Sequence, residues 1–169
     1  MAKVWNPLAT LTLSATQVSA TFSNIPGTYR DLYVVVSGQM NGSNGAVRLQ
    51  FNGDTGNNYY CTILEGTGTG GLGTYGYSAG SQPAIYTAGN SYPFSGSQNS
   101  VVTAHILDYA QTTKHKTALV HEGNGTTGGS LTSGRWANTA AITSVTIYAG
   151  TSTNNFVSGT TLALYGVTA

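Results

Sequence analysis

Charged residues are scarce in this chain: Asp, Glu, Lys and Arg make up 7% of its 169 residues, and the formal net charge is +1. The scarcity does not indicate disorder, because apolar residues make up 40% and are regularly spaced. Ser, Thr, Asn, Gln and Gly must therefore cover the surface, which leaves little charge repulsion between copies and favours association.

Clustered basic residues are also scarce, which argues against nucleic acid as a partner, because phosphate contacts need clustered Lys and Arg. The one tight basic cluster is Lys114-His115-Lys116. We interpret this cluster as a solvated hairpin turn.

Cysteine is nearly absent. Cys61 is the single cysteine, so an intrachain disulfide and the small disulfide-stabilised class are excluded. Its place in the alternating run Tyr59-Cys61-Ile63 predicts a buried side chain. No apolar stretch approaches the ~20 residues of a membrane helix, and no apolar signal region follows Met1. We expect a chain that is made in a cytoplasm, remains soluble there and inserts into no membrane.

Alternation of apolar and polar residues dominates what is present. In the segment Val101–Val120, Val102, Ala104 and Ile106 alternate with residues of the opposite face, and the chain returns after the short polar link Gln111–Thr113. A period of two is typical of strands rather than helices.

The same pattern predicts strands along the whole chain. They are expected at Thr10–Ser14, Gln17–Ser23, Leu32–Gly38, Ala46–Phe51, Asn58–Glu65, Ala141–Ala149 and Thr160–Val167, with an edge strand at Leu131–Trp136 and short strands near Thr74–Ser78 and Ala84–Thr87. The expected inward residues are Val18, Ala20 and Phe22, then Val145 and Ile147, then Leu162 and Leu164.

These elements predict an all-β fold, an antiparallel β-sandwich of the jelly-roll kind. Asn52-Gly53 is a hairpin signal, since both residues tolerate positive φ. We expect an N-terminal arm at 1–9 and one sandwich domain at 10–169, within which 66–98 is a variable region of long loops rich in glycine and tyrosine.

The sharpest candidate for catalysis is Gly76–Gly80, which matches the G-x-S-x-G nucleophile elbow around Ser78. Asp108 and then His115 or His121 follow in the order that α/β hydrolases use. That elbow requires a strand-to-helix turn on a parallel sheet, and no helical pattern follows Gly80. We therefore expect no enzymatic activity and no catalytic residues.

Metal and cofactor sites are weakly indicated. Oxygen ligands for Ca²⁺ are available at Asn52, Asp54, Asn57 and Asn58, but one carboxylate makes a weak site, and capping of a turn explains the same residues. The three histidines, His105, His115 and His121, have no metal-ligand spacing. We expect neither a metal nor a cofactor.

Four aromatic residues are candidates for partner binding. Tyr75, Tyr77 and Tyr86 fall among glycines, and tyrosine offers contact area with little rotamer entropy to lose. Trp5 falls on the expected arm, where a large exposed aromatic indicates a partner.

Several segments, taken in order, resemble small virion proteins of tailed bacteriophages, notably marine and cyanobacterial ones. They are FSNIPGTYRDLYVVVSG at Phe22–Gly38, VRLQFNGDTGNNYY at Val47–Tyr60, ILDYAQTTKHK at Ile106–Lys116, GRWANTAAITSVTIY at Gly134–Tyr148 and FVSGTTLALYGV at Phe156–Val167. The resemblance covers most of the chain outside 66–98 and consists of turns and inward strands, so it assigns no site residues.

The resemblance implies a β-sandwich on the outer surface of a virion. Its first expectation is a capsid decoration protein that contacts the major capsid protein and sister copies, as a homotrimer. The alternative is a tail-fibre or adhesin domain that binds a host-surface glycan. Brevity and the absence of shaft repeats favour decoration.

Overall fold

The structure is a computed structural model, which describes residues 4–42, 45–67, 70–88, 94, 98–124, 128–150 and 154–168, without the side chains of residues 75 and 77–81. This part of the chain forms strands and no helix, so it holds no helix that could span a membrane. The strands are β1 Trp5–Thr12, β2 Ser19–Phe22, β3 Asp31–Gly38, β4 Val47–Phe51, β5 Tyr59–Thr67, β6 Leu72–Gln82, β7 Ile85–Tyr86, β8 Ser100–Leu107, β9 Lys116–Asn124, β10 Gly128–Trp136, β11 Val145–Ala149 and β12 Thr161–Val167.

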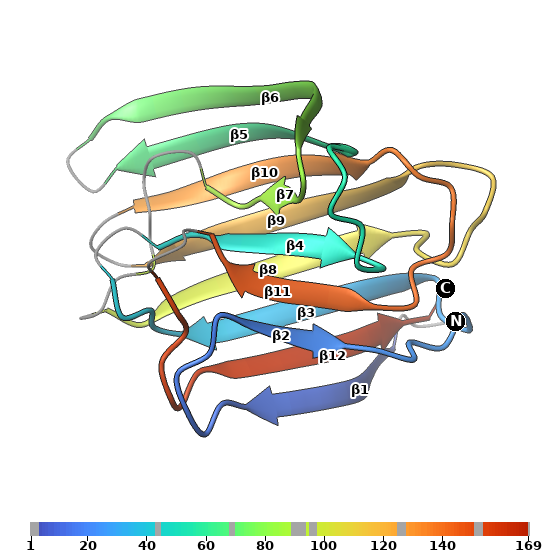
Figure 1. The fold of residues 1–169 in the computed structure, drawn as a ribbon, viewed down its shortest axis with the longest axis horizontal. Coiled ribbons are helices and arrows are strands. Elements are labelled where there is room, and N and C mark those ends of the chain that lie inside the picture. The colour runs from blue at the N-terminus through green and yellow to red at the C-terminus, as the bar shows by residue number, and fades with distance from the viewer. Residues whose placement is uncertain are drawn as a thin grey trace.

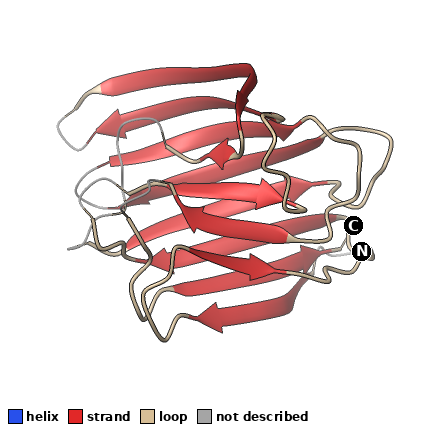
Figure 2. Cartoon of the chain, viewed as in Figure 1, coloured by secondary structure: helices blue, strands red, loops and turns tan. Residues whose placement is uncertain are grey.

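Two antiparallel sheets pack face to face, and the small sheet covers one face of the large one (Figures 1 and 2). The large sheet has eight strands in the order β1-β12-β3-β8-β9-β10-β5-β6, and the small sheet has four in the order β2-β11-β4-β7. The chain passes from one sheet to the other between β1 and β2 and at most later connections, as in a jelly roll. The predicted all-β antiparallel sandwich is therefore confirmed.

The core lies between the sheets and follows the predicted alternation. Val102, Ala104 and Ile106 of β8 are fully buried, as are Val145 and Ile147 of β11. Each buried residue alternates with an outward one, so the outer face of the large sheet carries the intervening side chains.

An aromatic cluster anchors one end of the core. The indole of Trp136 stacks on the Tyr59 ring with centroids 6.3 Å apart and meets Phe51 edge-on. Its Nε1–H donates to Asp54 Oδ2 at 2.6 Å, so the buried indole has a polar partner. The same carboxylate accepts from the backbone N–H of Gly56, which fixes the turn before β5.

Cys61 is buried, as the alternation predicted. Burial raises the pKa of its thiol to about 11, although the backbone N–H of Tyr86 donates to Sγ at 3.3 Å and acts in the opposite direction.

The expected arm at 1–9 is wrong for residues 4–9, its described part. Trp5 begins β1, which pairs along its length with β12, and the backbone N–H of Val4 donates to Thr168 Oγ1. Pro7 concealed this strand in the sequence, because proline cannot donate to a ladder; β1 accommodates it at the edge of the sheet, beside a bulge.

Two placements in other strands are also wrong. Val18, expected inward, is exposed because it precedes β2, whereas Ala20 and Phe22 are buried as predicted. The expected edge strand Leu131–Trp136 is part of β10, which lies inside the large sheet between β9 and β5. Its inward residues include Ser130, Thr132 and Gly134, which gave it the polar appearance of an edge.

The turn at Asn52-Gly53 has the predicted positive φ at both residues, but it joins no hairpin. β4 belongs to the small sheet and β5 to the large one, so this turn carries the chain between layers. The Asn52 side chain holds the turn by accepting from the backbone N–H groups of Thr143 and Ser144.

The variable region 66–98 is more regular than expected. Its described residues contain the eleven-residue strand β6 at the edge of the large sheet, and β7 in the small sheet. Seven glycines at 66–80 hid the strand, because glycine interrupts the alternation on which strand prediction depends. Residues 68–69, 89–93 and 95–97 lie outside the described part.

Candidate functional site

The outer face of the large sheet is the most distinctive surface of the described structure, because two adjacent hollows lie along it. The first has a volume of about 490 Å³ and the second about 510 Å³. Both are formed on β9, β10 and β5, where outward residues of neighbouring strands stand in rows across the sheet.

Three glycines form the floor of the first hollow. Gly123, Gly129 and Gly66 are cross-strand neighbours on β9, β10 and β5, so their row has no side chains. Val101 and Leu72 continue this row at its two ends. A Cβ added to Gly123 would lie 3.2 Å from the Gly129 Cα, so larger residues would both fill the hollow and crowd the ladder.

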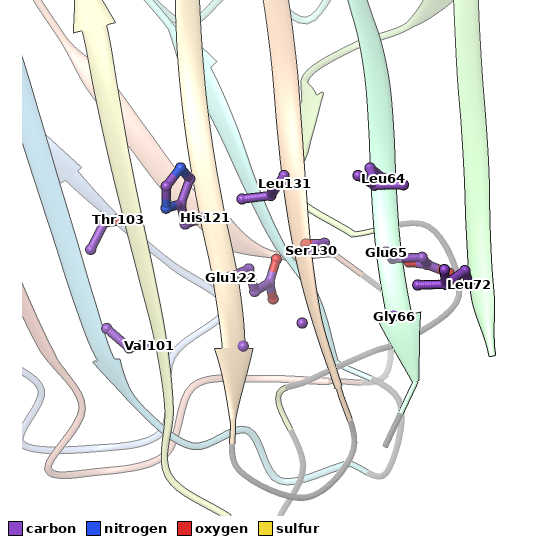
Figure 3. A pocket seen from close by; sticks show the side chains of 12 residues that line it. Leu64, Glu65, Gly66, Leu72, Val101, Thr103, His121, Glu122, Ser130 and Leu131 are labelled. Carbon is purple, nitrogen blue, oxygen red and sulfur yellow. The ribbon is translucent and has the colours of Figure 1, made fainter. Parts of the chain in front are cut away.

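Aliphatic side chains border this glycine row. Figure 3 shows His121, Leu131 and Leu64 side by side across the next row, and the register pairs them in that order. Leu64 and Leu131 are each 49% exposed, and Leu72 is 85% exposed. Exposed aliphatic residues grouped in this way are typical of a contact surface.

The second hollow lies further along the same strands and is lined by several polar side chains. Its outward residues form two rows: Thr117, Arg135 and Tyr60 in one, then Ser133, Thr62 and Gly76 in the next. The Arg135 guanidinium carbon lies 3.9 Å from the centroid of the Tyr60 ring. A guanidinium over an aromatic face is held by cation–π attraction, so the orientation of Arg135 is restricted.

Arg135 is the one exposed charge in the strands of the large sheet. The other charged residues of these strands, Asp31, Glu65, Lys116 and Glu122, are all buried. None of the ion pairs among the described residues includes Arg135; they join Arg30 and His105 to Asp31, and Lys114 to Asp108. The outer face therefore presents a cation with no carboxylate beside it.

Two buried carboxyl groups lie beneath the first hollow, on the core side of the sheet. Glu122 Oε1 accepts from the backbone N–H of Val47 at 3.3 Å, while Oε2 has no hydrogen-bond partner. Burial raises the pKa of Glu122 well above its ordinary value, and the nearby Glu65 carboxyl raises it further. Both effects favour the protonated form of this carboxyl group over the charged form.

Trp5, a predicted partner-binding residue, lies on the outer face near the opposite edge of the large sheet. Its ring centroid is 4.3 Å from that of Tyr33 and 6.0 Å from that of Tyr165, and the residue is 50% exposed. His105 continues this cluster and contacts the buried Asp31 through Nε2 at 3.1 Å. The indole is thus fixed on a strand rather than carried on a free arm.

The other predicted partner-binding residues lie far from Trp5. Tyr75 and Tyr77 belong to β6, at the opposite edge of the large sheet, and their side chains are outside the described part. Tyr86 lies in the small sheet, half-buried, with the Arg48 guanidinium carbon 3.9 Å from its ring centroid. The fold therefore does not bring the four aromatics into one site.

The hydrolase pattern does not have the context that it needs. Gly76–Gly80 lies inside β6, a strand of an antiparallel sheet, rather than at a strand-to-helix turn. Asp108 pairs with Lys114 at 2.6 Å, and His115 and His121 are exposed. The Ser78 side chain is outside the described part.

Asp54 and Asn58, two of the residues weighed as calcium ligands, hydrogen-bond to each other within the turn before β5. Asp54 binds the Trp136 indole, and its two oxygens accept from Asn58 Nδ2, at 3.2 Å to Oδ1 and 3.0 Å to Oδ2. Burial would raise the pKa of Asp54, but these hydrogen bonds and that from Gly56 hold it below its ordinary value. The described residues contain no group of three or more His, Cys, Asp or Glu that could hold a metal.

The basic cluster at Lys114–Lys116 differs from the solvated turn that we expected. Lys114 and His115 are exposed, but Lys116 is buried and its Nζ donates to the backbone carbonyls of Lys114 and Thr139. Burial lowers the pKa of Lys116, and the neighbouring Lys114 charge lowers it further. The alternation already placed Lys116 on the face of Ala118 and Val120, which was the available signal.

Sequence reasoning missed both hollows. The residues that form them are separated in the chain and meet only through the register of β9, β10 and β5. Arg135 did carry a signal, as one of only six Lys and Arg residues in the chain.

Comparisons with known proteins assign no family. No protein-family model matches the chain, and no curated protein is similar to it. Among solved structures, alginate lyase Aly36B is 9% identical, with 95% of this chain and 79% of that chain covered and a TM-score of 0.34. A mutant of that lyase in complex with an alginate trisaccharide is 8% identical, with 94% and 86% covered and a TM-score of 0.34. Likenesses this low carry no conclusion about activity.

Proposed function

We propose that this protein is a structural component of a bacteriophage virion, a capsid decoration protein on the outer surface of the particle. It contacts the major capsid protein and sister copies, and three copies form a symmetric ring. The resemblance of Phe22–Gly38, Val47–Tyr60 and the other segments to small virion proteins is the starting point of this proposal.

The position of Trp5 is the main structural support for attachment of the protein to the capsid. It is half-exposed on β1, at the edge of the large sheet, yet its orientation is fixed by Tyr33 and Tyr165. Large aromatics held in one orientation lose little entropy on binding and dominate many protein interfaces. Val4, the residue before Trp5, is also exposed.

Low charge supports association of the copies. A chain with a net charge of +1 repels its sister copies weakly, and the open edges β1 and β6 offer unpaired strand groups. A closed cyclic ring covers such edges without continuing into fibres, and it binds the particle through several weak contacts at once.

The test is the number of copies on purified particles that carry Trp5→Ala, measured by quantitative mass spectrometry. We expect a large loss of copies, whereas Val18→Ala, at a comparably exposed apolar residue outside the large sheet, should leave the number unchanged. Unchanged occupancy in Trp5→Ala would contradict attachment through β1. Native mass measurement of the free protein tests the trimer, and a strict monomer in solution and on the virion would contradict it.

The second candidate function is a tail-fibre or adhesin domain that binds a host-surface glycan. The hollow around Arg135 favours it, because this hollow offers hydrogen-bonding side chains and a cation that pairs with no described carboxylate. Reconstruction of the particle distinguishes the two locations.

A further inference from the structure

We propose that the hollow around Arg135 binds the acidic groups of an anionic polysaccharide, a chain that carries carboxylate or sulfate. This inference deepens the second candidate function, since it names the site and the chemical class of the glycan. It does not require a tail location, because a decoration protein can carry the same site.

Charge complementarity is the first argument. Arg135 is the one exposed charge in the large sheet, and every described side-chain carboxylate of the chain is buried or engaged elsewhere. A guanidinium binds carboxylate or sulfate through two parallel hydrogen bonds, which neutral ligands cannot match.

Preorganisation is the second argument. The guanidinium stacks over Tyr60 at 3.9 Å, and Arg135 and Tyr60 are direct cross-strand neighbours on β10 and β5. Both side chains therefore stand on rigid strands, so binding orders little that is not already ordered.

The groups around the arginine favour a sugar over other anions. Thr117 flanks Arg135 in its row, and Ser133 and Thr62 form the next row, so hydroxyl groups surround the cation. Hydroxyls both donate and accept, which suits the many hydroxyls of a saccharide. A hollow of about 510 Å³ falls within the size range of small-ligand sites.

The two hollows are lined by consecutive outward rows of the same strands, which favours a chain over a single sugar. From Arg135 to the glycine floor at Gly129 the strand runs six residues, roughly 20 Å at the rise of a β-strand. Ser133 and Leu131 lie between them on the same face. An extended ligand can therefore place its acidic group at Arg135 and the less polar faces of its rings along Leu131 and Leu64.

The experiment compares three polymers by calorimetry with the full-length protein: polygalacturonate, dextran sulfate and uncharged dextran. We expect binding of one or both charged polymers and none of dextran. Arg135→Gln should weaken binding about tenfold or more, the loss of one charge-assisted bidentate contact. Arg135 is exposed, so the substitution should not disturb the fold. The melting temperature of the Arg135→Gln protein checks that this variant folds.

Arg48→Gln is the matched control. Arg48 makes the same 3.9 Å stack on a tyrosine and carries the same charge, but it lies in the small sheet. It should bind the charged polymers as the wild type does. An equal loss of affinity in both variants would mean that binding depends on net charge alone, and would overturn the proposed site. Absence of polymer binding by the wild-type protein would also overturn it.

A further binding experiment distinguishes an anionic polysaccharide from an acidic peptide as the ligand. Poly-glutamate presents carboxylates without hydroxyl groups, so we expect it to bind more weakly than polygalacturonate. Thr117→Val and Ser133→Ala should weaken polygalacturonate binding and leave poly-glutamate binding unchanged. Equal affinities and equal responses would overturn the saccharide assignment. Particle occupancy of Arg135→Gln should stay normal, so failure here is distinguishable from failure of the attachment at Trp5.

Discussion

Arg135 and Trp136 are adjacent in the chain and lie on opposite faces of the same sheet. The polar group of one is buried and hydrogen-bonded, whereas that of the other is exposed. Trp136 is buried, and its one N–H donates to Asp54. Arg135 is exposed, and its guanidinium contacts a tyrosine ring but no carboxylate of the described residues.

The same contrast extends along the large sheet. On the core face, Lys116 donates to two backbone carbonyls, and burial raises the pKa of Glu122, which favours its neutral form. The outer face holds the one exposed charge and the two hollows. Substitutions on the core face should therefore change stability, and substitutions on the outer face should change binding.

The largest expected difference in stability is between the variants Trp136→Ala and Arg135→Ala. Trp136→Ala removes an indole packed between Tyr59 and Phe51, so we expect it to destabilise the fold by about 3–5 kcal/mol. Arg135→Ala should change the free energy of unfolding by less than about 0.5 kcal/mol, as is usual for exposed sites. Urea unfolding followed by tryptophan or far-ultraviolet signals measures both. Comparable losses in the two variants would contradict the division between the faces.

A pH titration of stability gives an intermediate effect, through Glu122. Its pKa in the folded protein is raised above the ordinary value of 4.5, so between these two values the folded state holds a proton that the unfolded chain has lost. The stability that this proton provides is complete below about pH 4.5 and is lost as the pH rises through the folded-state pKa, by up to about 1.4 kcal/mol per pH unit.

Glu122→Gln should remove this slope and make the protein more stable than the wild type at alkaline pH. Glu65 faces Glu122 and is the described group that couples to it. Asp108→Asn is the control, since the hydrogen bond and charge of Lys114 lower the pKa of Asp108 and its effect belongs to acidic pH. Parallel stability curves for wild type and Glu122→Gln would show that Glu122 is charged in the fold.

The sequence predicted what depends on local alternation. The inward sets Val145 and Ile147, or Leu162 and Leu164, are correct because a strand with one buried face must alternate. It failed where a single residue conflicted with the pattern, as with Pro7 in β1 and the glycines of β6. The hollows could not be predicted, because cross-strand register joins Gly66 to Gly129 and Tyr60 to Arg135, and register is a property of the whole sheet.

The smallest stability effect separates the two arginine–tyrosine stacks. Arg48 lies in β4 between Tyr86 and Tyr148, half-buried, and its side chain hydrogen-bonds to that of Tyr148. Arg48→Gln should therefore cost about 1 kcal/mol, from one hydrogen bond and one cation–π contact. Arg135→Gln loses a contact at an exposed site and should fall within about 0.5 kcal/mol of the wild type.

The measurement is chemical denaturation of both variants at two salt concentrations, because a screened surface contact weakens in salt while a half-buried one persists. Equal costs would mean that Arg135 supports the fold as Arg48 does. A larger cost for Arg48, together with polymer binding lost in Arg135→Gln alone, would show that two identical stacks serve different purposes: one closes the surface of the small sheet, and the other keeps a cation oriented beside an open hollow.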